Sequence, residues 1–363
     1  MSVLERDDAP PVRVIDIREP AVGLDAVVVI DHELFETSAG GTRMVRDVTT
    51  DEVARLARAM TWKLAVCGVP YAGAKAGIRF GDGDGDRAAV LEAFLEHVRE
   101  WRDVFLTGPD MGTHPEDFLS LEPDGSPLPI WARTHEGMGM DDLAVGYGIK
   151  GAGAVALGQL DRPFEGASIA IEGFGKAGAG TARACAQSGA RVIAVSTIEG
   201  TLVDPAGLDV GELLALRARH GDAFVHHGPV PAQPRETLFA VECDVLVPGA
   251  RPYVITPESV SELRCAAVIP AANVPYAPGA TDALAARGIL ALPDFVTNAG
   301  GIHLYEAPEC RDDPARCLAG VERLVGETTR RVLAAADAEH VTPTTAALRI
   351  ARGYLRDAQT ARE

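Results

Sequence analysis

The sequence predicts an α/β protein of two domains, in which an N-terminal α/β domain precedes a doubly wound parallel sheet. The chain has 363 residues, enough for two domains that each bury a sizeable core. Short apolar runs typical of strands alternate with helical stretches through the second half. A glycine-rich turn at residues 173–178 lies between the first two of those strands. We expect domains at 12–142 and 143–313, followed by C-terminal helices in 314–363.

The N-terminal domain is expected to begin with two strands and two helices. Residues 12–17 alternate apolar and polar side chains, typical of a half-buried strand, and residues 26–30 predict a more buried one. A capping pattern at residue 50 begins a helix that we expect to end at Met60. Apolar spacing predicts a second helix over 87–101. The polar segment before the first strand, residues 1–11, is expected to be disordered.

Two lysines suggest acid–base chemistry in this domain. Lys63 follows the first helix, and Lys75 stands among the small residues 72–77, which we expect to form a loop close to a ligand. A desolvated lysine beside a second cation has a depressed pKa and can act as a base near neutral pH. Asp110 lies in a later Gly/Pro loop, so the three could serve as anchor, base and proton shuttle. Their spacing alone fits ordinary surface lysines equally well.

The glycine turn of the second domain lies in a strand–turn–helix–strand frame. Residues 167–172 predict a strand, Gly173-x-Gly175-x-x-Gly178 the turn, 179–187 a helix and 191–195 the next strand. This frame is what a dinucleotide fingerprint requires, with the pyrophosphate at the helix N-terminus. We therefore expect a Rossmann-type domain. Its later strands are expected near 245–247, 267–269 and 288–292, and two helices are expected within 314–359.

The charge balance excludes several classes of partner. There are 34 Lys and Arg against 52 Asp and Glu, a formal net charge of −18. Such acidity argues against nucleic acid or an anionic membrane as a partner and favours a cytoplasmic protein. The N-terminus lacks the basic and apolar regions of a signal peptide. No apolar segment approaches the roughly 20 residues that span a bilayer.

The cysteines and acidic runs predict neither a disulfide nor a metal site. Six cysteines without a C-x-x-C pair are expected to be free thiols in a reducing compartment. The Asp/Gly run 81–86 resembles a calcium loop, but the position that needs a bidentate glutamate is Ala93. We therefore expect a solvated turn there and no metal. His135, His226 and His227 show no ligand spacing.

Seven stretches then occur in order between Gly40 and Ile302. They are Gly40-Gly41-Thr42-Arg43-Met44, Met60-Thr61-Trp62-Lys63, Gly73-Ala74-Lys75-Ala76-Gly77-Ile78, Pro109-Asp110-Met111-Gly112-Thr113, Gly173-Phe174-Gly175-Lys176-Ala177-Gly178, Ala272-Asn273-Val274-Pro275 and Pro293-Asp294-Phe295-Val296-Thr297-Asn298-Ala299-Gly300-Gly301. Together they resemble the glutamate/leucine/phenylalanine/valine dehydrogenase family, of which the chain looks like a divergent member. The resemblance implies a substrate and oligomerisation domain, a Rossmann domain, and C-terminal helices that pack back across both.

The resemblance also implies a reaction and roles for residues. An L-amino acid would lose a hydride to a nicotinamide, and water would hydrolyse the imine to a 2-oxo acid and ammonia. Lys63 would anchor the substrate carboxylate, Lys75 would activate the water and Asp110 would shuttle protons to and from the nitrogen. The substrate would be lined by Ala39, Gly41, Met44 and Gly108. NAD or NADP would be held by Gly173, Phe174, Gly175, Lys176, Ala177, Gly178, Ser196, Thr197, Gly249, Ala250, Asn273 and Asn298.

Departures from the family pattern indicate which class of substrate to expect. Glutamate-specific members place a lysine just before the Gly-Gly pair, where this chain has Ala39, and a serine after the Asn-Ala-Gly-Gly run, which residues 302–306 lack. Without that cation and hydroxyl, a side-chain carboxylate would be buried unpaired, which is costly. Ala39 and Gly108 instead suggest a roomy apolar pocket. We therefore expect an apolar or aromatic amino acid.

Other departures concern the cofactor. The acid that normally ends the second Rossmann strand is absent, since Val195 is followed by Ser196 and Thr197. Its loss removes repulsion of a 2′-phosphate, but no arginine stands beside it to bind that phosphate. Cofactor choice stays open, with NAD slightly favoured. Val145 replaces a threonine and Pro270 a glutamate of many relatives, which puts efficiency in doubt.

Three alternatives stay open. The chain could act on glutamate, or on a different 2-oxo or imino substrate. It could instead be a catalytically weak paralogue that binds nucleotide or amino acid as a sensor or partner subunit. Family members are usually homo-oligomers, so the resemblance also implies a homo-oligomer here.

Overall fold

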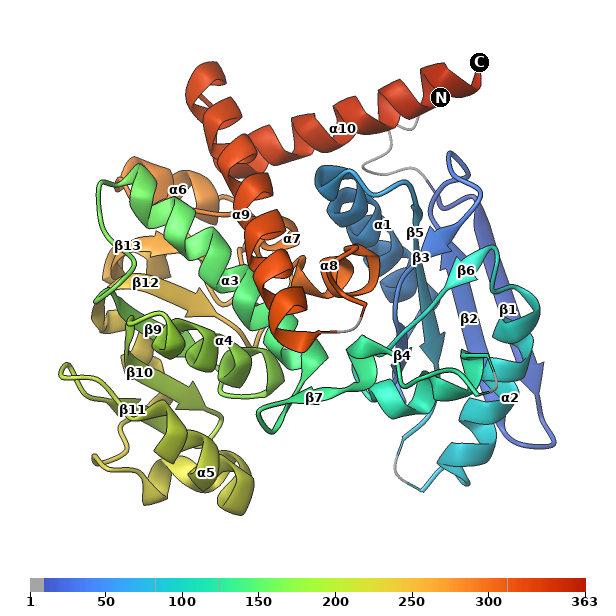
Figure 1. Cartoon of the computed structure of the whole chain (residues 1–363), viewed down its shortest axis with the longest axis horizontal. Coiled ribbons are helices and arrows are strands. Elements are labelled where there is room, and N and C mark those ends of the chain that lie inside the picture. The colour runs from blue at the N-terminus through green and yellow to red at the C-terminus, as the bar shows by residue number, and fades with distance from the viewer. Residues whose placement is uncertain (1–9, 82, 124, 312) are drawn as a thin grey trace. The chain divides into compact units, whose positions relative to one another are not determined.

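The computed structural model describes residues 10–363 apart from 82, 124 and 312, and the chain divides into two units (Figure 1). The N-terminal unit holds the described residues up to Ala132 together with Leu348–Glu363, and the Rossmann unit holds Arg133–Ala347. Residues 133–142, expected in the first domain, therefore group with the second unit. Most of the predicted disordered segment lies outside the described residues.

The sheet of the N-terminal unit has the strand order β1-β2-β5-β3-β6, with β4 also paired to β5. β1 and β2 form an antiparallel hairpin and β5 runs antiparallel to β2, whereas β3 and β4 run parallel to β5. The half-buried strand and the more buried strand predicted for residues 12–17 and 26–30 are thereby confirmed. The strands are β1 (Arg13–Glu19), β2 (Leu24–Ile30), β3 (Ser38–Ala39), β4 (Thr42–Met44), β5 (Ala72–Ile78) and β6 (Phe105–Leu106).

Helices cover both faces of this sheet. Successive side chains of a strand point to opposite faces, and in β2 Val27 and Val29 pack in one core cluster with residues of α1 (Thr50–Cys67). Val28 packs in the other cluster, with residues of α2 (Arg87–Glu100). The central strands are consequently buried between the two helices.

α1 is longer than predicted. Its cap is Thr49, whose side chain accepts a hydrogen bond from the Glu52 amide, and it runs to Cys67 rather than Met60. The apolar face continues past Met60, and the first residue that favours a stop is Gly68, which has a φ of 73°. Lys63 therefore lies within the helix instead of after it. α2 starts and ends close to the predicted residues and is capped by Asp86.

The small-residue segment around Lys75 is a strand and not the predicted loop. Residues 72–78 form β5, every residue of which is buried, and α1 packs against it. Small residues suit a strand that a helix approaches closely, because there is no bulk to hold the two apart. Residues 72–77 contain no β-branched side chain, which made this segment look like a loop.

The Rossmann unit is organised around a sheet of order β11-β10-β9-β12-β13-β14. All pairs are parallel except the β10–β11 edge. Its strands are β9 (Ser168–Glu172), β10 (Arg191–Thr197), β11 (Gly200–Val203), β12 (Glu242–Pro248), β13 (Arg264–Val268) and β14 (Leu290–Ala291). The order reverses between β9 and β12, where such sheets bind ligands at the carboxyl ends of the strands. The predicted α/β class with a doubly wound second sheet is confirmed.

Helices pack on both faces of this sheet, in two separate apolar clusters. α3 lies beside α4 and α9, as Figure 1 shows. α9 belongs to this unit, whereas α10 passes into the N-terminal unit from Leu348 onward. The helices are α3 (Met140–Gln159), α4 (Lys176–Gln187), α5 (Val210–His220), α6 (Ala280–Ala286), α7 (Asp294–Thr297), α8 (Gly300–Glu306), α9 (Pro314–Glu339) and α10 (Pro343–Arg362). A short hairpin of β7 (Thr134–His135) and β8 (Met138–Gly139) precedes α3.

The expectation that all six cysteines are free thiols is wrong. Cys310 and Cys317 form a disulfide, and the other four cysteines remain thiols outside any disulfide. α9 begins at Pro314, behind the Asp313 cap, which places Cys317 in its first turn. The turn at Cys310, whose amide donates to Ala307 O, brings the second sulfur to it. The spacing of the cysteines along the chain did not reveal this disulfide, because it is the start of α9 that brings the two sulfurs together.

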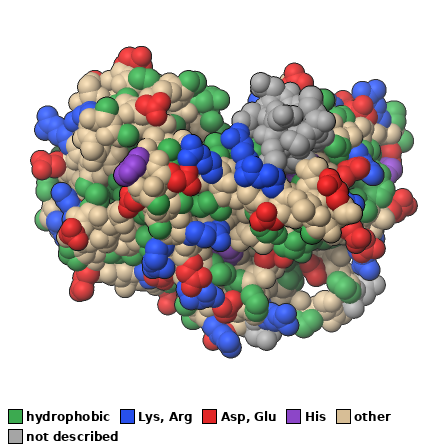
Figure 2. Space-filling view, turned by 90° about the horizontal axis from the view of Figure 1, so that it is seen from above, with side chains coloured by type: hydrophobic (Ala, Val, Ile, Leu, Met, Phe, Trp, Pro, Cys, Tyr) green, Lys and Arg blue, Asp and Glu red, His purple; other side chains and the backbone are tan. Residues whose placement is uncertain are grey.

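Three further observations concern membrane-spanning helices, metal sites and surface charge. No helix in the described part of the chain is long and apolar enough to cross a membrane. Among residues 10–363, leaving aside 82, 124 and 312, no three His, Cys, Asp or Glu side chains are grouped to hold a metal ion. Acidic and basic side chains are interspersed on the face shown in Figure 2, so the charge is not gathered into one patch there. Of the predicted solvated turn at 81–86, residue 82 lies outside the described residues.

Candidate active site

β5 carries Lys75 on the sheet face that meets α1. The alanines of the strand point into the α2-side core, so Lys75 shares the opposite face with Gly73 and Gly77. A Cβ on Gly73 would lie 2.3 Å from Ala57 O of α1, and one on Gly77 would lie 2.7 Å from a methyl of Val53. The two glycines therefore let the helix close against the strand on either side of Lys75, whose side chain is only 9% exposed.

Lys75 forms an ion pair with Asp110. Its Nζ lies 2.9 Å from Asp110 Oδ2, and Arg43 Nε donates to the same oxygen at 3.0 Å. Arg43 also donates through Nη1 to Glu52 Oε1 at 2.5 Å. Burial by itself raises the pKa of the Asp110 carboxyl, but the charges of Lys75 and Arg43 outweigh it and lower that pKa below its ordinary value. This half-buried carboxylate is thus kept ionised by two cations.

Gly41 lies directly against this pair. A Cβ on it would lie 2.7 Å from Pro109 O, 3.1 Å from Asp110 Cβ and 3.3 Å from Lys75 Nζ. Any side chain at residue 41 would push into the pair, so glycine is required there. The structure thus brings together three residues predicted from sequence, Lys75, Asp110 and Gly41. Sequence reasoning missed Arg43, although it stands within the motif that contains Gly41.

The other predicted substrate residues also belong to the N-terminal unit. Lys63 is half-buried in α1 and Ala39 is half-buried in β3. Gly108 follows β6, and its carbonyl accepts the Thr42 amide at 2.9 Å. Met44 is 4% exposed and packs in the α2-side core, so its side chain lies among other apolar groups. Their roles toward a substrate stay predictions.

In the Rossmann unit the glycine turn connects β9 to α4. Gly173 has a φ of 86°, and a Cβ on Gly178 would lie 1.8 Å from Gly173 O, so neither position tolerates a side chain. A Cβ on Gly175, the residue before α4, would meet nothing within 4 Å, which leaves open space at the helix N-terminus. The first amides of a helix lack intrahelical partners and attract anions. This geometry suits the pyrophosphate predicted for it.

The side chains within the turn differ in their surroundings. Phe174 is buried and its ring lies 5.2 Å from that of Phe224, so this predicted cofactor residue belongs to the core through its side chain. Lys176 is exposed and Ala177 is half-buried at the start of α4. Only the backbone of Phe174 could face a cofactor, and the roles of all three stay predictions.

A buried carboxylate that sequence reasoning missed organises the next loop. Glu172, the last residue of β9, accepts hydrogen bonds from the amides of Gly249 and Ala250, at 3.1 and 2.9 Å. Its other oxygen accepts one from Arg251 Nε at 2.9 Å. The loop after β12 is thereby held against the glycine turn, where Ala250 Cβ would be 2.6 Å from a Cβ on Gly173. The sequence feature that could have revealed Glu172 is a charged residue directly before a Gly-x-Gly turn.

The end of β10 lies beside the same turn. Ser196 Oγ accepts a hydrogen bond from the Gly173 amide at 3.3 Å. Thr197 is buried, and its hydroxyl donates to Asp222 O at 2.9 Å and accepts from the Glu199 amide. The Thr197 hydroxyl is therefore hydrogen-bonded to backbone groups of the protein, both as donor and as acceptor. The structure places both residues at the strand end, as predicted.

Asn273 and Asn298, predicted from separate motifs, are hydrogen-bonded to each other. Asn298 Nδ2 donates to Asn273 Oδ1 at 2.9 Å. Asn298 Oδ1 is buried and has no hydrogen-bond partner among the described residues. A buried acceptor without a donor is costly, and the amide of a nicotinamide carboxamide would satisfy it. Together with the glycine turn, this orphan acceptor fits a nicotinamide dinucleotide.

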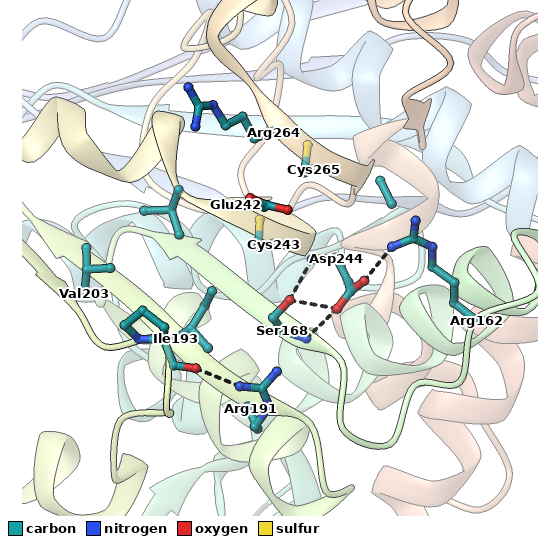
Figure 3. Close-up of a pocket in the computed structure, with 13 residues that line it drawn as sticks. Arg162, Ser168, Arg191, Ile193, Val203, Glu242, Cys243, Asp244, Arg264 and Cys265 are labelled. Atoms are coloured by element: carbon teal, nitrogen blue, oxygen red, sulfur yellow. Dashed lines mark hydrogen bonds and ion pairs between the residues drawn. The ribbon is translucent and has the colours of Figure 1, made fainter.

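A hollow of about 780 Å³ lies elsewhere, at the amino ends of β9, β10, β12 and β13 (Figure 3). Its polar groups bond largely to one another, since Asp244 accepts from Arg162 at 2.7 Å and from Ser168 at 2.7 Å. The glycine turn and the Asn pair follow the carboxyl ends of the strands. This hollow is therefore not part of the dinucleotide site.

Comparison with known proteins gives matches along nearly the whole chain. Residues 12–121 match the family described as Glu/Leu/Phe/Val dehydrogenase, dimerisation domain, and residues 137–361 match that described as Glutamate/Leucine/Phenylalanine/Valine dehydrogenase. The NADP-specific glutamate dehydrogenase A1 of Halobacterium salinarum is 31% identical over 72% of this chain and 66% of its own length. A glutamate dehydrogenase of Thermotoga maritima is 31% identical over 75% of this chain and 69% of its own. The chain thus spans about two thirds of these relatives.

Solved structures share the fold over almost the entire chain. The hetero-hexameric glutamate dehydrogenase of Thermus thermophilus, in a leucine-bound form, has a TM-score of 0.84 at 24% identity, covering 97% of this chain and 90% of that one. The L-tryptophan dehydrogenase of Nostoc punctiforme has a TM-score of 0.67 at 20% identity, covering 96% of each chain.

Proposed function

Because the chain belongs to the glutamate/leucine/phenylalanine/valine dehydrogenase family, a family of NAD(P)-dependent amino-acid dehydrogenases, we propose that it oxidatively deaminates an apolar or aromatic L-amino acid. The products are the 2-oxo acid and ammonia, and the reaction is reversible. The observation that carries the proposal is the Lys75–Asp110 ion pair at 2.9 Å, with Gly41 against both residues. A protein that only binds ligands has no need of a proton shuttle beside a lysine base.

The reaction balances as amino acid, water and NAD(P)⁺ giving 2-oxo acid, ammonium, NAD(P)H and one proton. When bound, the nicotinamide supplies the hydride acceptor. Lys63 anchors the substrate carboxylate by a charge-assisted hydrogen bond. Lys75 takes a proton from water as it attacks the imine carbon. Asp110 takes a proton from the substrate nitrogen and returns it as ammonia leaves.

The cofactor residues proposed are those of the Rossmann unit. The glycine turn and α4 would hold the pyrophosphate, and the Asn273–Asn298 pair would hold the nicotinamide end. We propose NAD ahead of NADP, because the end of β10 offers Thr197 and Ile198 where a basic side chain would favour a 2′-phosphate. The NADP-specific Halobacterium relative argues the other way, so both cofactors belong in the assay.

The apolar substrate class is proposed from Ala39, which stands where glutamate-specific members carry a lysine, and from Gly108, which with Ala39 suggests a roomy apolar pocket. Relatives named glutamate dehydrogenases at 31% identity make glutamate the competing substrate. We propose a homo-oligomer in the cytoplasm; the Thermus thermophilus structure is itself described as hetero-hexameric. The functional domains proposed are 12–142 for substrate binding and oligomerisation, 143–313 for dinucleotide binding and 314–363 for the C-terminal helices.

The test is consumption of NADH and NADPH with ammonia and a panel of 2-oxo acids. We expect turnover with phenylpyruvate or 4-methyl-2-oxopentanoate, and a loss of about 10²–10⁴-fold in Lys75→Ala. Lys150→Ala is the matched control, because Lys150 also forms a half-buried ion pair, with Glu322 at 2.8 Å, but lies outside the proposed site. Turnover of 2-oxoglutarate at least as fast as of the apolar acids would refute the substrate class.

A second candidate function is supported by the departures at Val145, Thr197 and Pro270. The chain would then be a catalytically weak paralogue that binds nucleotide or amino acid as a sensor or partner subunit. It predicts cofactor binding by titration without turnover of any 2-oxo acid. Turnover that disappears in Lys75→Ala excludes it.

A further inference from the structure

The Asp110 carboxylate is bonded asymmetrically. Lys75 Nζ and Arg43 Nε both contact Oδ2, at 2.9 and 3.0 Å. No hydrogen bond to Oδ1 occurs among the described residues, and the side chain is 20% exposed. One oxygen is thus saturated by two cations while the other is left for a ligand. A proton exchanged with a substrate nitrogen would be carried by Oδ1.

Arg43 also binds a second carboxylate, that of Glu52. It extends from β4 with a side chain 14% exposed, and Nη1 donates to Glu52 Oε1, in the first turn of α1, at 2.5 Å. Its pKa is raised above the ordinary value, because Asp110 and Glu52 together outweigh the effect of burial. The planar guanidinium therefore links strand, helix and the Asp110 loop in one fixed geometry.

Lys75 and Arg43 differ in whether their charge changes during the reaction. Lys75, as the base, must be neutral during part of the cycle, and Asp110 then loses one of its two positive neighbours. Burial would at that moment favour protonation of the carboxylate. Arginine does not deprotonate in proteins, so Arg43 supplies a charge that persists whatever the state of Lys75.

We propose that Arg43 is a positioning residue that binds Oδ2 of Asp110 and keeps this carboxylate ionised while Lys75 is neutral, so that Oδ1 can accept a proton from the substrate nitrogen. In that step an N–H bond breaks and an O–H bond forms, and the proton returns when ammonia leaves as ammonium. The inference rests on the proposed function for the identity of the proton donor. The link between Arg43 and the charge of Asp110 does not depend on it.

The test compares Arg43→Gln, Arg43→Lys and Arg58→Gln in the full chain. Arg58 is a matched control, because its side chain is also 14% exposed and its Nε donates to both oxygens of buried Asp31 at 2.8 Å. In Arg43→Gln we expect the acid limb of the kcat/KM pH profile to move up by about 1–3 pH units. Arg43→Lys should restore part of that shift, and Arg58→Gln should leave the limb where it is.

A direct titration of Asp110 separates this inference from the proposed function. Carboxyl carbon NMR, with Asp110→Asn to assign the signal, reports the charge of Asp110 whether or not the protein turns over. An upward shift of the Asp110 titration in Arg43→Gln supports the inference even if no 2-oxo acid is a substrate. An unchanged titration overturns it, as does an equal loss of kcat in Arg43→Gln and Arg58→Gln with no movement of the acid limb.

Discussion

Asp142 is a carboxylate whose replacement should stabilise the protein at neutral pH. It lies in the first turn of α3, half-buried, beside Asp141. Burial and the charge of Asp141 raise its pKa to about 6, and Lys176 and Arg217 offset only part of this. The folded state therefore prefers the protonated acid. The stability that this group contributes is complete below the ordinary pKa of 3.8 and is lost as the pH rises through about 6.

The magnitude follows from the two pKa values. The interval between 3.8 and about 6 corresponds to about 3 kcal/mol of folding free energy lost at pH 8. Asparagine keeps the shape and carries no charge, so Asp142→Asn should raise the free energy of unfolding by about 1–3 kcal/mol at pH 8. At pH 4 the gain should fall below about 1 kcal/mol, since the wild-type acid is then mostly protonated in the folded state.

The assay is urea unfolding of wild type and Asp142→Asn at pH 4 and pH 8. The control is Asp51→Asn, which removes an exposed carboxylate from the first turn of α1 and should change stability by at most about 1 kcal/mol, downward, through the helix dipole. A gain for Asp142→Asn that is equal at both pH values would contradict this prediction, and so would a loss at pH 8.

Three other substitutions test packing and burial. Gly73→Ala should destabilise the N-terminal unit by several kcal/mol, because its Cβ would lie 2.3 Å from backbone atoms of α1. Gly158→Ala, in α3 with nothing within 4 Å of its Cβ, should stabilise by up to about 1 kcal/mol, and thermal unfolding of the pair checks both. Burial, with Arg323 nearby, lowers the pKa of His303 to about 4, so its contribution is lost as the pH falls below 6.5. His303→Gln should therefore lose less stability between pH 7 and pH 5 than wild type, and an equal loss in urea unfolding would contradict this.

Features that depend on residues adjacent along the chain could be predicted from the sequence. Alternation predicted β1, a continuous apolar run predicted β2, and the spacing of glycines between a strand and a helix predicted the Rossmann turn. These features are readable because their geometry repeats over a few residues. The roles of Lys75, Asp110 and Gly41 came from motifs, and the structure places the three in contact. Asn273 and Asn298 were likewise predicted apart and are hydrogen-bonded.

The remaining features depend on contacts between residues that are distant along the chain, and they became visible in the folded structure. Residues 72–78 form a strand since α1 closes on Gly73 and Gly77, and no local propensity records that approach. Arg43 and Glu172 matter to the site because of their partners. Other elements bring the Asp110 carboxylate to Arg43 and the Arg251 guanidinium to Glu172. Charge pairing and close packing act through space, so a sequence read along its length shows the groups but not their partners.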